Sequence, residues 1–256
     1  MKTATVVRHA LVTGGGQGIG AAIASRLVAS GARVTVLGRR LEVLQALAVQ
    51  APEQIHAVAA DVADAEQVGR ALASAQARFG VVQVLVNNAG QAESMPFQKM
   101  DLALWQRMLT VNLTGSMVCA QAVLPGMLDS NWGRIVNVAS TAGLVGYAYV
   151  TAYCAAKHGV IGLTRALALE LATKGITVNA VCPGYTDTDV IRQSIDRVVA
   201  KTGRSADAAR DEFIRANPQG RLVQPQEVSD AVAWLCGDGA GAVTGQSLSV
   251  SGGEVM

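Results

Sequence analysis

The chain has 256 residues, of which 50% are hydrophobic, 16% are charged and only 4% are aromatic. This composition excludes a disordered chain and predicts one large aliphatic core, because the length is near the upper limit for a single domain. The formal net charge of +2 is too balanced to indicate nucleic acid or an anionic membrane surface as a partner.

Targeting and metal-binding patterns are not apparent in the sequence. No uninterrupted apolar run is long enough to span a membrane, and Arg8 and His9 interrupt any signal-peptide core. The four cysteines are widely scattered and form no C-x-x-C pair, which favours neither a metal site nor a disulfide framework. We therefore expect a protein of the reducing cytoplasm.

Short β-branched runs alternate with longer segments that carry apolar residues at helical spacing. The predicted strands are 10–13, 33–37, 55–59, 84–86, 134–138, 177–181 and 248–250. The predicted helices are 19–29, 41–48, 66–79, 102–128, 152–173 and 226–236. Because the strands are apolar throughout, both faces of a parallel sheet must be covered. The sequence thus predicts an α/β fold, with residues 1–256 as one doubly wound, Rossmann-like domain that has helices on both faces.

One polar, charged segment interrupts this alternation. Residues 186–221 contain many arginines and aspartates, with Gly184 before them and Pro218 and Gly220 near their end. A solvated helical excursion would explain the charges. Ligands of doubly wound sheets bind beside the strand ends, so we favour a short helical lid over the substrate.

A glycine-rich loop separates the first predicted strand from the first predicted helix. It reads Thr13-Gly14-Gly15-Gly16-Gln17-Gly18-Ile19-Gly20. Glycines let the backbone approach a pyrophosphate, and the helix N-terminus supplies unpaired N–H groups. Glycines also serve ordinary turns, but the position in the first βαβ unit favours a dinucleotide site.

The second predicted strand ends at Gly38-Arg39-Arg40, where NAD-binding folds place a carboxylate for the ribose 2′-hydroxyl. Two guanidinium groups instead suit a 2′-phosphate. The alternative is that both arginines are solvated, one of them paired with Glu42. The sequence therefore favours NADP, with NAD as the alternative.

Three polar side chains form a second pattern. Tyr153 and Lys157 are four residues apart in a predicted helix and so share one face. A cation near a phenol favours the phenolate, so we expect Lys157 to lower the pKa of Tyr153. Ser140 ends the fifth predicted strand, close enough in sequence to bring its hydroxyl to the same pocket. Together these residues indicate acid/base catalysis beside a nucleotide.

With Asn87-Asn88-Ala89-Gly90 after the fourth strand, these motifs resemble the short-chain dehydrogenase/reductase family over nearly the whole chain. The resemblance implies a catalytic tetrad of Asn112, Ser140, Tyr153 and Lys157, in which Asn112 interrupts a helix and holds a proton-relay water. It implies that Asp61 contacts adenine, that Asn87 and Gly90 lie by the adenosine ribose, and that residues 183–188 lie by the nicotinamide. The expected cofactor contacts are Thr13, Gly14, Gly16, Gln17, Gly18, Ile19, Gly20, Arg39, Arg40, Asp61, Val62, Asn88, Ala89, Gly90, Tyr153, Lys157, Pro183, Gly184, Thr186 and Thr188.

The expected reaction interconverts a 3-oxoacyl and a 3-hydroxyacyl thioester by hydride transfer, with Tyr153 as the acid/base and Ser140 as the donor to the substrate oxygen. The thioester branch rests on resemblance. Coenzyme A is favoured over acyl carrier protein because the turn before the fifth predicted strand, residues 129–132, contains no Lys or Arg that could dock an acidic carrier protein. The alternatives are another small ketone, secondary alcohol or sugar, and a cofactor-sensing regulator without catalysis. The resemblance also implies a homotetramer.

Overall fold

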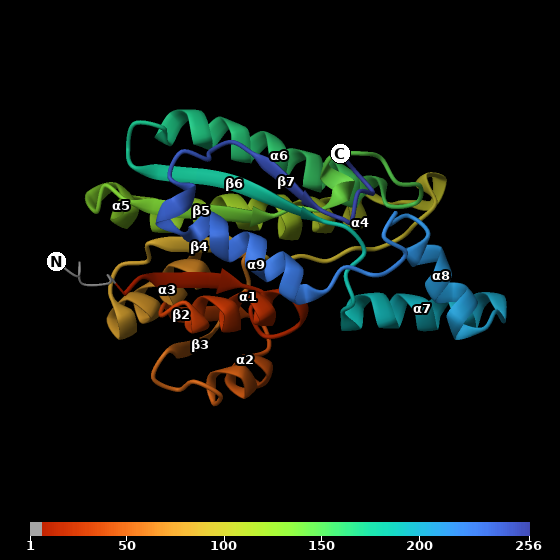
Figure 1. The fold of residues 1–256 in the computed structure, drawn as a ribbon, viewed down its shortest axis with the longest axis horizontal. Helices are drawn as coiled ribbons and strands as arrows, with labels where there is room; N and C mark the ends of the chain where they lie inside the picture. Colours follow the sequence, from red (N-terminus) through yellow and green to blue (C-terminus); the bar gives the residue numbers. More distant parts are fainter. Residues whose placement is uncertain (1–6) are drawn as a thin grey trace.

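A computed structural model describes residues 7–256 and shows one parallel, seven-stranded sheet (Figure 1). The strand order is β3-β2-β1-β4-β5-β6-β7. The strands are β1 (His9–Thr13), β2 (Arg33–Gly38), β3 (Ile55–Ala59), β4 (Val84–Asn87), β5 (Gly133–Val138), β6 (Ile176–Pro183) and β7 (Ser247–Val250). This confirms the doubly wound, Rossmann-like α/β fold, and each predicted strand is found within two residues of its expected ends.

Helices cover both faces of the sheet. On one face, α1 (Gly18–Ala29), α2 (Leu41–Ala48) and α9 (Pro225–Cys236) bury an aliphatic cluster against β1 and β2. On the other face, α3 (Ala65–Phe79), α5 (Gly115–Asp129) and α6 (Thr151–Leu171) do the same. The core is built from Ala, Val, Leu and Ile, as the low aromatic content requires.

The predicted helix over 102–128 is divided. It begins as α4 (Leu102–Leu109), continues as a π-helical turn over Thr110–Thr114, and then becomes α5. Residues 102–129 are long and apolar enough on average, at a mean hydropathy of 1.3, to cross a membrane by those measures alone. Cys119, Val123 and Met127 of this stretch pack on the sheet, and a buried core helix passes the same test.

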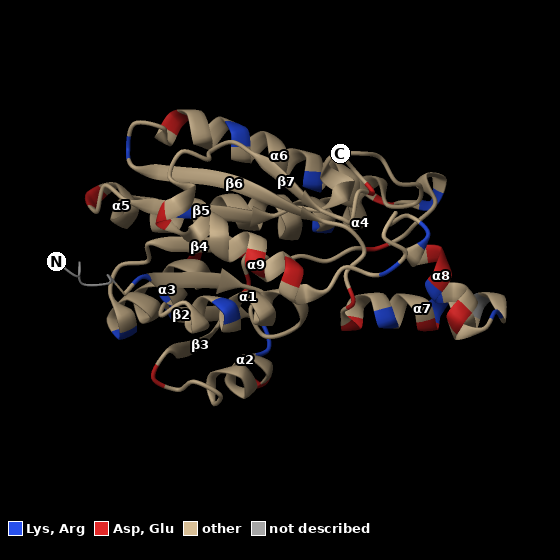
Figure 2. Cartoon of the chain, viewed as in Figure 1, with Lys and Arg blue, Asp and Glu red and all other residues tan. Residues whose placement is uncertain are grey.

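The charged segment over 186–221 contains two helices, α7 (Asp189–Thr202) and α8 (Ala206–Ile214). They project beyond the carboxyl ends of the strands, at the end of the molecule away from the beginning of β1 (Figure 1). Acidic and basic residues are dense along both helices (Figure 2). Many of them pair within the segment, since Arg192 contacts Asp187 and Asp189 at 3.2 and 3.0 Å.

A buried polar network joins the sheet to α5 and α6 below the site. Asn87 in β4 donates from Nδ2 to Oδ1 of Asn137 in β5 at 2.9 Å. Asn137 donates in turn to the Thr164 hydroxyl of α6 at 2.9 Å, and Asn87 also donates to the Ser116 carbonyl of α5 at 3.1 Å. Because buried amides need partners, this network fixes how α5 and α6 sit on the strand ends.

Candidate active site

A cavity of about 1330 Å³ lies along the carboxyl ends of the strands. It extends from the end of β2, across the glycine-rich loop, to the beginning of α6 and the inner side of α7. The strand order reverses here, because β1 pairs with β2 on one side and with β4 on the other. This is the topological switch point at which open parallel sheets bind ligands.

The glycine-rich loop forms the floor of one half of the cavity. Gly14 and Gly18 have φ of +63° and +53°, which glycine adopts without strain. Gly20 must be small, because a Cβ there would lie 2.1 Å from the Gly14 carbonyl oxygen. Gln17 precedes α1 without capping it by its side chain, so the first N–H groups of the helix have no side-chain acceptor. The N-terminus of α1, with its partial positive charge, thus lies at the cavity beside glycine backbone that no side chain covers.

The two arginines after β2 are both exposed and both line the cavity. Arg40 donates from Nη2 to the Gln17 side-chain oxygen at 2.5 Å, which ties it to the glycine-rich loop. Asp61 and Val62 lie at the same end of the cavity. The Asp61 carboxylate accepts from the Ala63 backbone at 3.0 Å and is thereby oriented.

Two residues expected at the cofactor are placed elsewhere. The Thr13 hydroxyl is 1% exposed and accepts from the backbone N–H groups of Asn88 and Ala89 at 3.0 Å each, so it holds the two loops together from behind. Asn87 belongs to the buried network under α5. Neither residue lines the cavity. Successive side chains of a strand point to opposite faces of the sheet, and these two point into the core. Every other predicted contact lines it.

Asn112 occupies the π-helical turn and is buried at 1% exposure. Its Nδ2 donates to the carbonyls of Gln91 and Met108 at 2.9 and 3.0 Å, and its Oδ1 accepts from the Gln91 N–H at 3.1 Å. Gly90 must be small, since a Cβ would lie 2.7 Å from that Oδ1. The side chain therefore anchors the loop after β4 to the helix at the cavity edge.

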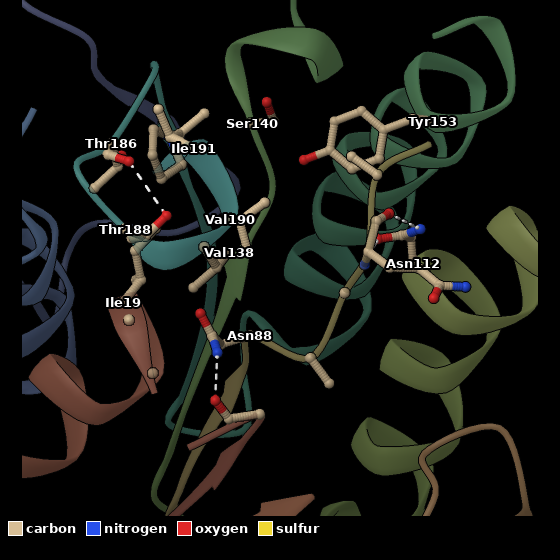
Figure 3. Close-up of a pocket in the computed structure, with 18 of the residues that line it drawn as sticks. Ile19, Asn88, Asn112, Val138, Ser140, Tyr153, Thr186, Thr188, Val190 and Ile191 are labelled. Carbon is tan, nitrogen blue, oxygen red and sulfur yellow. Dashed lines mark hydrogen bonds between the residues drawn. The ribbon is translucent and has the colours of Figure 1, made fainter. Parts of the chain in front are cut away.

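Ser140, Tyr153 and Lys157 meet at the other half of the cavity, as the sequence predicts. In Figure 3 the Tyr153 hydroxyl points into the cavity on the side of Ser140. The Lys157 Nζ lies 5.6 Å from the centre of the Tyr153 ring and donates to the Val138 carbonyl at the end of β5, at 2.8 Å. The ammonium is thus buried with one protein acceptor and two further N–H donors.

The expected pKa of Tyr153 is wrong for the protein as it stands. Burial raises the pKa of the Tyr153 phenol to about 12, against the opposing influence of the Ser140 hydroxyl. Burial also lowers the pKa of Lys157 to about 8. Desolvation is the largest influence on the Tyr153 phenol, and it favours the neutral form.

Sequence reasoning missed the wall opposite this pair. The wall contains half-buried aromatic rings, with Tyr185 contacting Tyr147 and Phe213 edge-to-face at 6.4 and 5.1 Å between centroids. Further cavity-lining residues come from the loop after β4 and from α7: Glu93, Ser94, Val190, Ile191, Ser194, Arg197 and Val198. Phe213 alone carried a signal, as the one aromatic residue in the charged segment.

Comparison with known proteins shows which family has this fold and these motifs. The family model "short chain dehydrogenase" matches residues 8–198. The chain belongs to the short-chain dehydrogenase family. As a member of that family it is an NAD(P)-dependent oxidoreductase that acts on CH–OH groups.

Named relatives of this short-chain dehydrogenase match it along nearly all of its length. The granaticin polyketide synthase putative ketoacyl reductase 1 of Streptomyces violaceoruber is 41% identical, over 95% of this chain and 92% of its own. The acetoacetyl-CoA reductase of Shinella zoogloeoides is 39% identical, over 96% and 98%. A crystal structure of a single-residue variant of actinorhodin polyketide ketoreductase with NADPH superposes with a TM-score of 0.93 at 41% identity, covering 97% of both chains.

The depressed pKa of Lys157 makes a prediction for stability. Between pH 8 and 10.5 the unfolded chain binds more protons at this lysine than the folded chain, so this group makes the free energy of unfolding rise with pH. The rise totals about 3 kcal/mol. Buried thiols such as Cys119 and Cys236 have raised pKa values and make the free energy of unfolding fall with pH in both proteins. Urea unfolding of wild type and Lys157→Met is therefore expected to show a difference, wild type minus variant, that grows by about 3 kcal/mol across this range. The exposed Lys174→Met is the control, and parallel curves for wild type and Lys157→Met would contradict the prediction.

Proposed function

We propose that the protein interconverts a 3-oxoacyl thioester and its 3-hydroxyacyl form with NADP(H), and that coenzyme A carries the acyl group. The observation that carries the proposal is the placement of the Tyr153 hydroxyl, which faces the cavity on the side of Ser140, with the buried Lys157 ammonium 5.6 Å from the centre of its ring. Relatives named ketoacyl reductase and acetoacetyl-CoA reductase support this substrate class.

The residues present fit a dinucleotide phosphate. The uncapped N-terminus of α1 and the glycine-rich loop would hold the pyrophosphate, and Arg39 and Arg40 the 2′-phosphate. Asp61 and Val62 would contact the adenine, and Asn88 to Gly90 its ribose. The two free N–H donors of Lys157 suit the nicotinamide ribose, with the backbone from Pro183 to Thr188 beside the ring. The related ketoreductase was solved with NADPH, which supports NADP over NAD.

The chain's own residues supply the proton chemistry. When bound, the reduced cofactor supplies the hydride that reaches the carbonyl carbon. Tyr153 Oη gives its proton to the carbonyl oxygen, and Ser140 Oγ donates a hydrogen bond to the same oxygen as negative charge develops there. The Lys157 ammonium stabilises the phenolate that remains, and Asn112 keeps the cavity edge in place. Oxidation runs the same steps in reverse.

The charge distribution on the lid favours a small carrier. Arg192 and Arg204 are each paired with acidic neighbours on the same segment, so they present no uncompensated basic rim to an acidic carrier protein. Arg197 lines the cavity itself, from α7. This guanidinium, at the α7 side of the cavity and apart from Arg39 and Arg40 at the end of β2, suits the phosphates of coenzyme A better than the surface of a protein.

The proposal predicts that the purified protein reduces acetoacetyl-CoA with NADPH, and that Tyr153→Phe lowers kcat by about 10²–10⁴-fold. The loss is expected because the variant removes the proton donor but keeps the ring. Initial-rate assays and NADPH titration are the measurements, with NADPH affinity retained. The exposed Tyr149→Phe is the matched control.

Three results would contradict parts of this proposal. A Tyr153→Phe variant that keeps a tenth of wild-type kcat would exclude the acid/base assignment. A tenfold preference for the same acyl group on acyl carrier protein would exclude the coenzyme A carrier. Inactivity toward both thioesters would exclude the thioester substrate and favour another small ketone.

Cofactor choice gives a second prediction. Arg39→Asp and Arg40→Ala are expected to lower the ratio of kcat/KM for NADPH over NADH roughly ten- to hundredfold each, since each removes a charged hydrogen bond to the 2′-phosphate. Arg70→Asp on α3, which is outside the cavity, is the control. A wild-type protein that binds NADH more tightly than NADPH in calorimetry would refute the preference.

We also propose a homotetramer, because large apolar side chains are exposed on two separate faces. Leu169 on α6 is 83% exposed and marks one apolar surface. Trp234 on α9 and Leu248 on β7 are also exposed and mark a second one. Light scattering is expected to give about four times the chain mass of 26.4 kDa. Leu169→Glu should reduce this mass, and a stable wild-type monomer at micromolar concentration would contradict the assembly.

A further inference from the structure

The aromatic wall of the cavity is backed by a carboxylate that the proposed reduction does not use. The Tyr147 hydroxyl donates to Oε1 of Glu254, and Tyr147 also contacts the Thr141 hydroxyl at 2.9 Å. Oε2 of Glu254 is buried and has no hydrogen-bond partner within residues 7–256. Among the side chains that the structure describes, which leave out that of Lys201, none forms an ion pair with Glu254. The negative charge behind the wall is therefore not neutralised locally.

The position of Glu254 is built into the C-terminal segment. Ser251 is buried, shares a 2.8 Å hydrogen bond with Ser249 and accepts from the Val255 N–H at 3.3 Å. Gly252, at φ +65°, lies against the Asn217 side chain, where a Cβ would come within 2.1 Å of Oδ1. These contacts hold the C-terminal segment against Asn217, near the end of the segment 186–221, and thereby limit where the Glu254 carboxylate lies.

Gly184 lets this carboxylate approach the cavity. A Cβ on Gly184 would lie 2.6 Å from Oε2 of Glu254, so the oxygen packs on bare backbone. Gly184, Tyr147 and Tyr185 all line the cavity. Burial and the negative charge of Glu254 both raise the pKa of Tyr185, as expected for a carboxylate immediately behind the wall.

The wall belongs to the reacting half of the cavity. Tyr147 lies on the loop between Ser140 and Tyr153, so a substrate whose carbonyl meets those two hydroxyls places its neighbouring atoms beside Tyr147 and Gly184. A free β-oxo acid would bring a second carboxylate to this poorly solvated wall, where like charges repel strongly. An ester or thioester at the same position is neutral.

We infer that Glu254 is a specificity-determining residue, which excludes β-oxo acids with a free carboxylate and admits their neutral esters and thioesters. The inference rests on the proposed function. Phosphates of a coenzyme A carrier are compatible with it, because Arg197 lines the cavity from α7, which projects away from the sheet (Figure 1). The selectivity is thus set by a charge near the reacting carbonyl, through repulsion of the wrong substrate.

The test compares methyl acetoacetate with acetoacetate at pH 7, as the ratio of kcat/KM for ester over acid with NADPH. Glu254→Gln keeps an acceptor for Tyr147 and removes the charge, so the ratio is expected to fall at least tenfold, mainly through a lower KM for the acid. Tyr147→Phe keeps the charge and the ring, and the ratio is expected to stay within threefold of wild type. Glu170→Gln, exposed at the far end of α6, is the matched control.

An unchanged ratio in an active Glu254→Gln variant would overturn the inference. So would an equal fall in Tyr147→Phe, because the orientation of the ring would then set the selectivity. Inactivity of the wild type toward the ester would not contradict the proposed function, which the acetoacetyl-CoA assay tests separately. In that event calorimetry with 3-hydroxybutyrate and its methyl ester decides, since Glu254→Gln is expected to strengthen binding of the acid tenfold, and unchanged binding would refute the role of Glu254.

Discussion

The buried ammonium of Lys157 imposes the tightest physical constraint on this protein, because a cation removed from water must keep its few compensating contacts. Its protein acceptor is the Val138 carbonyl at the carboxyl end of β5, 2.8 Å away. That bond requires α6 to sit at one height on the sheet, and a Cβ on Gly143 would lie 2.8 Å from the Lys157 carbonyl oxygen. The same height places Tyr153, one turn earlier on the helix, over the cavity with Ser140. The geometry of the active site thus depends on the one position at which the Lys157 ammonium can be buried with a hydrogen-bond acceptor.

The rest of the cavity follows from the parallel sheet. Strand ends that meet at one edge bring together the glycine-rich loop, the end of β2 and the loop after β4, although these segments are far apart in the sequence. Buried hydrogen bonds, accepted by the Thr13 hydroxyl and donated by the Asn87 amide, keep these loops and helices in register. Residues of the segment 186–221 complete the lining of the cavity, and Thr188 lies close to Gly18 at the beginning of α1.

Burial has two effects on the site. It raises the pKa of Tyr153 and lowers the pKa of Lys157, so it favours the neutral form of both side chains. Around the substrate, the same low polarity makes an unpaired carboxylate such as Glu254 influential over a short range. The chain contains few aromatic residues, yet Tyr147, Tyr153, Tyr185 and Phe213 all line this cavity. Their rings exclude water without adding charge.

The sequence by itself determined the fold class, the strand positions and the glycine-rich loop, because apolar periodicity and glycine placement are local properties. It also determined the Tyr153–Lys157 pair, since a four-residue spacing on a helix settles which side chains are neighbours. The apolar pattern over 102–128 continues without interruption, so the break at Thr110–Thr114 was expected only through the family resemblance at Asn112, and its π-helical form was not predicted. Only the tertiary structure decided that Thr13 and Asn87 point into the core, that burial raises the pKa of Tyr153, and that Glu254 reaches Tyr147 across 107 residues of sequence. Each of these depends on what surrounds a side chain, and desolvation and long-range contacts exist only once the chain has folded.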